Sequence, residues 1–224
     1  MKPADLRFAI LAVDVAVVSV VEDAPQVLLT PVHLPPDIIH AQALPGGLVR
    51  PEETAEDAVA RHLSEKCGLD GCYSEQLATF SGVDRDPRGR VVSVAYLVVV
   101  AETLARKHHL ANGLRWRTIA KVGKLAYDHN EIVVTALERL RQKLQSTTIA
   151  RHLIMPPFTL AALQNIYEKV LDRPLDKRNF RKKLFAEGIV RSTGKKLRGT
   201  IGPPSELYRF SGSKVEVIDI LAGL

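Results

Sequence analysis

The residues best suited to bind a metal ion lie between Gly47 and Leu69. A helix is expected there, and positions 62, 65 and 66 fall at i, i+3 and i+4, so their side chains share one face. Carboxylates at all three would hold Mg²⁺, which prefers oxygen ligands and activates water for hydrolysis. Only Glu65 is a carboxylate, whereas His62 suits magnesium poorly and Lys66 repels it. The sequence therefore predicts neither a metal site nor a catalytic residue here.

The same stretch resembles the Nudix box, Gly-x5-Glu-x7-Arg-Glu-Ψ-x-Glu-Glu-x-Gly-Ψ, in which Ψ is apolar. The matching residues are Gly47, Glu53, Arg61, Glu65, Gly68 and Leu69. The departures are His62 and Lys66, which stand where the family box has glutamates. Nudix hydrolases cleave nucleoside diphosphates linked to another group. The resemblance implies a Nudix fold that has lost this hydrolytic activity.

Charge divides the chain into two parts. Residues 1–147 carry 17 Lys and Arg against 18 Asp and Glu, and residues 148–224 carry 14 against 7, so the excess of +6 comes from the last third. Such asymmetry is typical of a separate module that binds a polyanion. We therefore expect one domain over residues 1–147 and a second over residues 148–224.

The cysteines and the hydropathy of the sequence indicate in which cellular compartment the protein is expected. Cys67 and Cys72 have no partner ligands at metal spacing and are expected to be reduced thiols. Asp14 and Ser19 interrupt the longest apolar run, so neither a signal peptide nor a membrane span is expected. These features predict a soluble, cytoplasmic protein.

The first domain alternates strand-like and helical segments. Strands are expected at 8–21, 26–30, 75–82, 90–101 and 114–117, with a hairpin turn near 22–25 and a proline-bearing loop at 31–40. One helix should begin at Thr54, with Asp57 in a capping box, and end at Gly68. Another should cover 130–145, with Asp128 as its cap. This order predicts an α/β (α+β) fold, the Nudix α/β/α sandwich around a mixed sheet.

The sequence of the second domain predicts a winged helix-turn-helix. Thr159 caps a helix with an apolar stripe, and Asp176 caps the next, in which Phe180 and Leu184 face inward. Strands at 189–191 and 207–210 then flank a basic turn, 192–202, which would form the wing. Basic residues of the second helix and the wing would contact bases and phosphates of double-stranded DNA. The DNA-binding residues predicted are Thr159, Lys177, Arg178, Asn179, Arg181, Lys182, Lys195, Lys196 and Arg198.

Nearly the whole chain resembles the Nudix-related transcriptional regulators of NAD metabolism, the NrtR type. Besides the altered box, the similar stretches are Arg85-Asp-Pro-Arg-Gly-Arg, Tyr127-Asp-His and the basic stretch 175–184. The resemblance implies a homodimeric repressor that binds a palindromic operator and is released by an ADP-ribose-like nucleotide, with no cofactor required. Relatives of similar architecture sense sugars or sugar phosphates, and the residues do not choose between these ligands.

One residue of the box suggests how such a ligand would be held. Lys66 occupies the position of a metal ligand, so its ammonium would stand where magnesium would and neutralise a diphosphate without activating water. The effector-binding residues predicted are Arg50, Glu53, Arg61, Glu65, Lys66, Arg85, Arg88 and Arg90. Arg61 is also expected to pair with Glu53 and hold the loop.

Three other residues are expected to have structural roles and no part in ligand binding. Tyr96 and Trp116 are expected in the core, and His129 is interpreted as a polar residue at a helix start.

An enzyme remains the alternative. An active Nudix pyrophosphohydrolase acting on ADP-ribose or a related nucleoside diphosphate would have to hold its metal with Glu53, Glu65 and a substitute such as Glu52 or Glu56.

Overall fold

The computed structural model describes residues 8–34, 39–107, 113–197, 204–218 and 220. The chain divides into two compact units. The first comprises Met1–Val18, Gln26–Val99 and His108–Ala136, and the second comprises Ser19–Pro25, Val100–Lys107 and Leu137–Leu224. Within the described part of the chain, every helix is too short or too polar to span a lipid bilayer.

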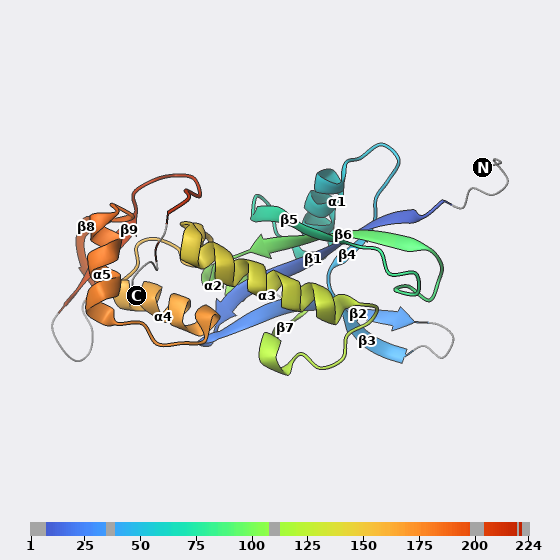
Figure 1. The fold of residues 1–224 in the computed structure, drawn as a ribbon, viewed down its shortest axis with the longest axis horizontal. Coiled ribbons are helices and arrows are strands. Elements are labelled where there is room, and N and C mark those ends of the chain that lie inside the picture. The colour runs from blue at the N-terminus through green and yellow to red at the C-terminus, as the bar shows by residue number, and fades with distance from the viewer. Residues whose placement is uncertain (1–7, 35–38, 108–112, 198–203, 219, 221–224) are drawn as a thin grey trace. The chain divides into compact units, whose positions relative to one another are not determined.

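A seven-stranded mixed sheet carries the first unit (Figure 1). Its main path runs β3-β2-β1-β6-β5, while β4 pairs with β1 and β7 pairs with β2. Strands β1 and β6 are parallel, and the other described pairs are antiparallel. The strands are β1 (Ile10–Val21), β2 (Ala24–Leu34), β3 (Ile39–Ala43), β4 (Gly46–Leu48), β5 (Tyr73–Phe80), β6 (Val91–Val99) and β7 (Arg115–Thr118).

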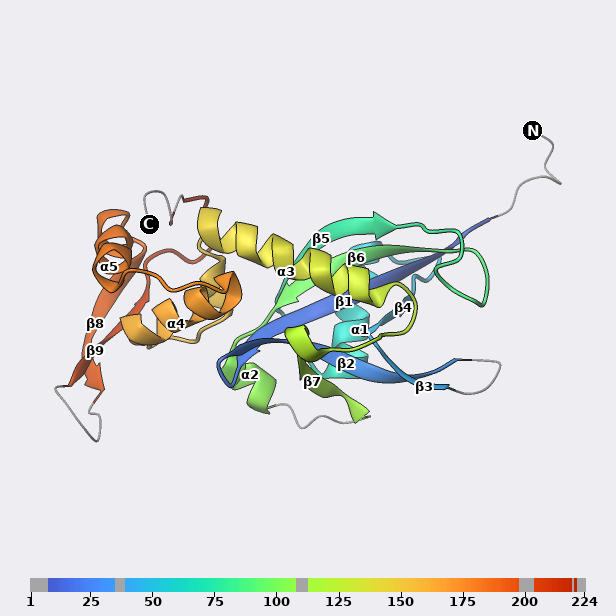
Figure 2. The ribbon, with the colours of Figure 1, turned by 60° about the horizontal axis from the view of Figure 1, so that its bottom comes forward.

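Helices cover both faces of this sheet. Figure 2 shows α1 and the first turns of α3 on opposite faces. Ala58 and Val59 of α1 are buried, as are Ile132 and Val133 of α3. The helical elements up to the end of α3 are α1 (Ala55–His62), η2 (Leu63–Cys67), α2 (Glu102–Lys107), η4 (Ile119–Lys121) and α3 (His129–Ser146). The predicted mixed sheet between helices is confirmed.

The predicted bounds of the box helix are also confirmed. Thr54 is the N-cap and forms a capping box with Asp57. Gly68 ends the helix in the left-handed region, with φ of 63°. The last turn, η2, is a π-helix, a form that often marks functional sites.

Two local expectations were wrong. Residues 31–40 do not form a loop throughout, because Thr30–Val32 of β2 pairs with Ala41–Ala43 of β3. A partner distant in sequence overrides the proline signal at Pro31. Asp128 does not cap α3 with its side chain, because its carboxylate accepts hydrogen bonds from Arg85 instead.

The winged helix-turn-helix lies in the second unit. Its elements are η5 (Ile149–His152), α4 (Leu160–Leu171), α5 (Lys177–Ala186), β8 (Val190–Leu197) and β9 (Ser205–Phe210). Thr159 and Asp176 cap the two helices as predicted. The rings of Tyr167 and Phe180 meet edge to face at 5.1 Å, and both are buried. This contact holds α5 against α4.

Strands β8 and β9 are longer than the sequence predicts. Ser192 pairs with Tyr208 and Lys196 pairs with Glu206, across an irregular stretch that contains Gly194. The bulge lets the ladder continue past a glycine that we interpreted as part of the wing turn.

A segment after β9 returns along the end of α3 and was not predicted. The amides of Ile218 and Ile220 donate to the carbonyls of Ser146 and Gln145, and Ile220 is fully buried. These main-chain bonds tie the chain after β9 to the residues that precede η5.

Candidate functional site

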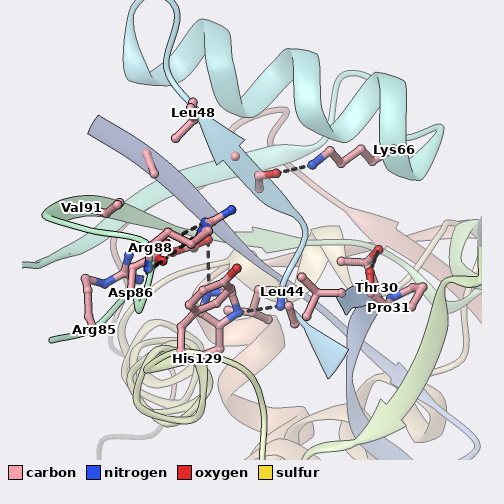
Figure 3. Close-up of a pocket in the computed structure, with 17 residues that line it drawn as sticks. Thr30, Pro31, Leu44, Leu48, Lys66, Arg85, Asp86, Arg88, Val91 and His129 are labelled. Carbon is pink, nitrogen blue, oxygen red and sulfur yellow. Dashed lines mark hydrogen bonds and ion pairs between the residues drawn. The ribbon is translucent and has the colours of Figure 1, made fainter. Parts of the chain in front are cut away.

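A cavity of about 280 Å³ opens in the first unit (Figure 3). Its apolar lining includes Ala12, Pro31, Val32, Ala43, Leu44 and Val91. Its polar lining includes Asp14, Lys66, Arg85, Asp86, Arg88, Tyr127 and His129. A mixture of apolar surface and a few convergent charged groups is typical of a small-molecule site.

Arg85 joins two carboxylates that are far apart in sequence. It donates to Asp14 Oδ2 at 2.9 Å and to the two carboxylate oxygens of Asp128 at 2.8 and 2.6 Å. Its side chain is only 4% exposed, and a buried charge is costly unless it is paired. Arg85 therefore lines the cavity, but its guanidinium is engaged by the protein itself.

His129 is buried beside Asp14. The main-chain amide of Leu44 donates to Nδ1 of His129 at 2.8 Å, so the ring proton lies on Nε2. That nitrogen faces Asp14 Oδ1 at 3.3 Å. His129 begins α3 as predicted. Its burial was not predicted, because its partners Leu44 and Asp14 lie far earlier in the sequence.

The two aromatic residues expected in the core differ. Tyr96 is buried as predicted, whereas Trp116 is half-buried.

These contacts set the charge state of Asp14. Burial would raise the pKa of Asp14, but the hydrogen bond from His129 and the charge of Arg85 outweigh it and lower the pKa to about 2. Asp14 is therefore an anion throughout the neutral range and keeps Arg85 and His129 in place.

Lys66 and His62 both reach β4. Lys66 Nζ donates to the carbonyl oxygen of Gly46 at 2.5 Å. A Cβ atom at Gly47 would lie 2.7 Å from the His62 ring, so only glycine fits at 47. His62 is 6% exposed, and burial, with the nearby charges of Lys66 and Arg61, lowers its pKa. A neutral imidazole and an ammonium thus occupy the two altered positions of the box.

Glu65 is exposed and is engaged by arginines. It lies 3.6 Å from Arg61 of α1 and 4.0 Å from Arg50, which follows β4. The lone carboxylate of positions 62, 65 and 66 is therefore paired with cations of the protein itself.

The predicted pairing of Arg61 with Glu53 is confirmed. Arg61 Nε donates to Glu53 Oε2 at 2.9 Å, a second bond joins Arg61 Nη2 to Glu53 Oε1, and the Arg50 amide also donates to Glu53. The hydrogen bond from Arg61 is the main reason that the pKa of Glu53 falls to about 2. Four predicted effector-binding residues, Arg50, Glu53, Arg61 and Glu65, form this cluster and do not line the cavity.

The loop before β6 separates the remaining arginines. Arg88 lines the cavity, pairs with Asp86 at 2.7 Å and places its guanidinium carbon 5.4 Å from the centre of the Tyr127 ring. Its side chain is 57% exposed. Arg90 donates to the carbonyls of Ser81 and Gly82 and does not line the cavity. Of the predicted effector-binding residues, Lys66, Arg85 and Arg88 are brought together.

The outer face of α5 is cationic. Its exposed residues include Lys177, Arg178, Asn179 and Lys182, while Phe180 and Leu184 are fully buried. Arg178 and Asn179 are side chains that suit bidentate contacts with guanine and adenine.

Arg181 does not share this exposed face. It follows buried Phe180 directly, at the edge of the apolar stripe, so its side chain turns toward β9. Within the described residues its Nε is buried and has no hydrogen-bond partner. Arg181 lines a second cavity of about 280 Å³ with Thr159, Ala161 and Tyr208. Arg181 is thus partly buried, unlike the other cations predicted on this helix.

The wing residues fall into three groups. Lys195 and Lys196 are exposed on β8, but Lys196 stands opposite Glu206 in the ladder and Lys195 does not. Arg198 lies outside the described residues.

Comparison with known proteins matches both parts of the chain. Residues 11–137 match the NUDIX domain, and residues 150–210 match the NrtR DNA-binding winged helix domain. The "ADPR responsive transcriptional repressor NtrR" of Acinetobacter baylyi is 34% identical over 92% of this chain and 84% of its own length. The chain belongs to the NrtR family.

Two further relatives bear on this NrtR-family chain. The crystal structure of Shewanella oneidensis NrtR complexed with a 27mer DNA superposes with a TM-score of 0.80, at 29% identity, over 90% of this chain and 93% of that one. The ADP-ribose pyrophosphatase of Methanocaldococcus jannaschii is 36% identical over 41% of this chain and 54% of its own length.

Replacing Asp14 with Asn should destabilise the protein in a pH-dependent way. Because the folded pKa of Asp14 is depressed, its contribution is present above the unfolded value near 4 and is lost as pH falls toward 2. Urea unfolding should therefore show a loss of about 2 kcal/mol at pH 7 that shrinks steadily below pH 4. Asp84→Asn, at an exposed loop position, is the control. A deficit of equal size at pH 7 and at pH 3 would contradict the pairing.

Proposed function

We propose that this protein is a DNA-binding transcriptional repressor whose NUDIX domain binds a nucleotide such as ADP-ribose. The observation that carries the proposal is the exposed, cationic helix α5 within an NrtR DNA-binding winged helix domain. The division into a sensing domain, residues 1–147, and a DNA-binding domain, residues 148–224, belongs to this proposal. The proposal also includes that the protein acts in the cytoplasm and controls genes of NAD metabolism.

The DNA-binding surface consists of α5 and the wing. Arg178 and Asn179 are exposed and contact base edges, while Lys177, Lys182 and Lys195 contact phosphates. Arg181, half-buried beside the N-terminus of α4, contacts the backbone instead of a base. The protein acts as a homodimer on a palindromic operator, with recognition helices about 34 Å apart or a multiple of that distance.

The effector occupies the cavity of the first unit. Lys66 and Arg88 face it with cations, and Tyr127 adds an aromatic surface. A nucleoside diphosphate matches this lining. Its anionic phosphates complement the cations of Lys66 and Arg88, and its flat base complements the aromatic ring of Tyr127. The A. baylyi relative's description as ADPR responsive supports ADP-ribose.

The positions in the box favour binding without cleavage. Lys66 places an ammonium against the Gly46 carbonyl, and His62 is buried and neutral. Three of the carboxylates that an enzyme would recruit are engaged elsewhere: Glu53 and Glu65 with arginines, and Glu56 with the Tyr96 hydroxyl at 2.8 Å. The fourth, Glu52, is exposed.

The second candidate is a pyrophosphohydrolase acting on ADP-ribose. The similarity to the M. jannaschii enzyme favours it over part of the chain. In that case the basic domain would steer an anionic substrate or bind RNA.

A pair of assays separates the two candidates. The repressor should retard duplex DNA taken from directly upstream of its own coding sequence, release it when ADP-ribose is added, and leave ADP-ribose intact with magnesium. Rapid magnesium-dependent turnover with no DNA retardation at low salt would overturn the proposal.

Replacing Lys66 with Ala should weaken ADP-ribose binding about tenfold, because a hydrogen bond to a charged group contributes about 1.5 kcal/mol. Isothermal titration calorimetry measures the change. Lys124→Ala removes an exposed cation that does not line the cavity and should bind as wild type does. Equal affinities of the Lys66 variant and wild type would contradict the assigned role.

Replacing Arg178 with Ala should relax base preference at one position of each half-site by about 1–3 kcal/mol. Replacing Arg181 with Ala should lower the affinity for DNA of every sequence by a similar factor, because its side chain is directed toward α4 and β9 and contacts no base. Binding to an operator library with each base substituted distinguishes the two. If the Arg181 variant changes preference and the Arg178 variant does not, the assignment is reversed.

A further inference from the structure

The hairpin of β1 and β2 belongs to both units of the chain. Ala12 and Asp14 of β1 line the cavity of the first unit, as do Thr30 and Pro31 of β2. The same two strands, which are neighbours in the sheet, continue into Ser19–Pro25, a segment of the second unit. Two paired strands therefore connect the lining of the effector cavity to the unit that contains α4 and α5.

The turn at the end of this hairpin has a defined conformation. Glu22 and Asp23 form the whole loop between the strands, with φ of 49° and 59°. Positive φ at both positions gives a tight turn whose twist matches that of its strands. Glu102 of α2 accepts a hydrogen bond from the Glu22 amide at 3.3 Å and pairs with Arg106 at 2.7 Å. The turn is thus held by its own strands and by α2.

One hydrogen bond joins this turn to α4. Nδ2 of Asn165 donates to Oδ1 of Asp23 at 2.6 Å, and both residues lie within the second unit. In the next turn of α4, the buried ring of Tyr167 packs against Phe180 of α5. A shift of α4 at Asn165 would therefore carry α5 with it.

The surroundings of this hydrogen bond are not close-packed. A cavity of about 290 Å³ in the second unit is lined by Val20, Asp23 and Thr103 of the hairpin and α2. Met155 and Asn165 are among the residues that line it on the side of α4. Protein interiors ordinarily contain few voids larger than a water molecule. Separation of the turn from α4 would thus break a hydrogen bond without disrupting a packed core.

The C-terminal end of α4 is held by α3. Nε of Arg141 donates to the carbonyl oxygen of Val170 at 2.8 Å, in the last turn of α4, where helix carbonyls lack partners within the helix. Val170 is also fully buried. Because this end of α4 is fixed, a displacement at Asn165 would tilt the helix instead of moving it as a whole.

We propose that the hydrogen bond between Asp23 and Asn165, the hairpin contact, transmits effector binding to the DNA-binding helices. The inference rests on the proposed function and names the regulation of that same site. A ligand shifts a conformational equilibrium only if it interacts differently with the two states. The effector contacts β1 and β2 in the cavity, the hairpin moves α4 through this contact, and α4 reorients α5. Asp23 and Asn165 do not line the effector cavity, so they are positioning residues.

The test measures the coupling factor, the factor by which saturating ADP-ribose weakens DNA binding. Fluorescence anisotropy gives the Kd for a duplex taken from directly upstream of the coding sequence, with and without ADP-ribose. Asn165→Ala removes the donor, and Asn165→Asp sets two carboxylates against each other. In both variants the coupling factor should fall about fivefold or more, as expected for loss of one hydrogen bond. Calorimetry without DNA should give the wild-type Kd for ADP-ribose.

The exchange variant Asp23→Asn, Asn165→Asp provides a rescue. It reverses donor and acceptor and keeps a hydrogen bond between an amide and a carboxylate. Asn suits position 23 because it adopts positive φ more readily than most residues. The exchange should restore the wild-type coupling factor, whereas a purely structural role of Asn165 in α4 predicts no such recovery.

Gln142→Glu is the matched control. It adds a negative charge at an exposed position of α3 in the second unit and should keep the wild-type coupling factor. An equal fall in this control would assign the effect to charge and overturn the inference, as would an exchange variant that stays uncoupled.

The wild-type protein separates the two proposals. If ADP-ribose does not weaken its binding to DNA, the proposed function fails, and this inference fails with it. If ADP-ribose releases DNA from wild type and equally from both Asn165 variants, only this inference fails.

Discussion

A buried arginine between two aspartates is the interaction on which the first unit depends. Arg85 is nearly inaccessible to water, so its charge must be balanced inside the protein, and Asp14 and Asp128 supply the balance. Asp14 belongs to β1, Arg85 to the loop before β6 and Asp128 to the turn before α3. One ion-pair network therefore fixes three distant segments, and it sets the position of His129, which in turn holds the Leu44 amide near β4.

The cavity combines this fixed network with a less constrained cationic rim. Asp14, Arg85 and His129 satisfy one another, so they shape the cavity more than they attract a ligand. Lys66 and Arg88 are exposed, and each retains donors beyond its present contact. The family box gathers carboxylates around a metal. In this chain the ammonium of Lys66 contacts the Gly46 carbonyl, so this position of the box presents positive charge beside β4.

In the winged domain, apolar packing decides where charge is displayed. Phe180 and Leu184 orient α5, and Phe210 orients β9, so that cations project from the opposite sides. Arg181 sits at the boundary and is drawn toward β9. A helix can hold basic residues around most of its circumference, but its core contacts determine which of them reach a partner.

Local sequence signals determined most of the longer strands and helices, both helix caps in the winged domain, the Thr54 capping box and the altered charges of the box, because each depends on residues within a few positions of one another. The short elements β3, β4 and α2 were not predicted. Tertiary structure decided the pairing of Pro31 in β2, the burial of His129, the contact of Glu65 with Arg50 and the pairing of Arg191 with Arg209. Each of these depends on a partner distant in sequence, or on the face that a neighbouring element covers. Spacing along the chain does not encode such contacts, and they exist only once the sheet and helices have packed.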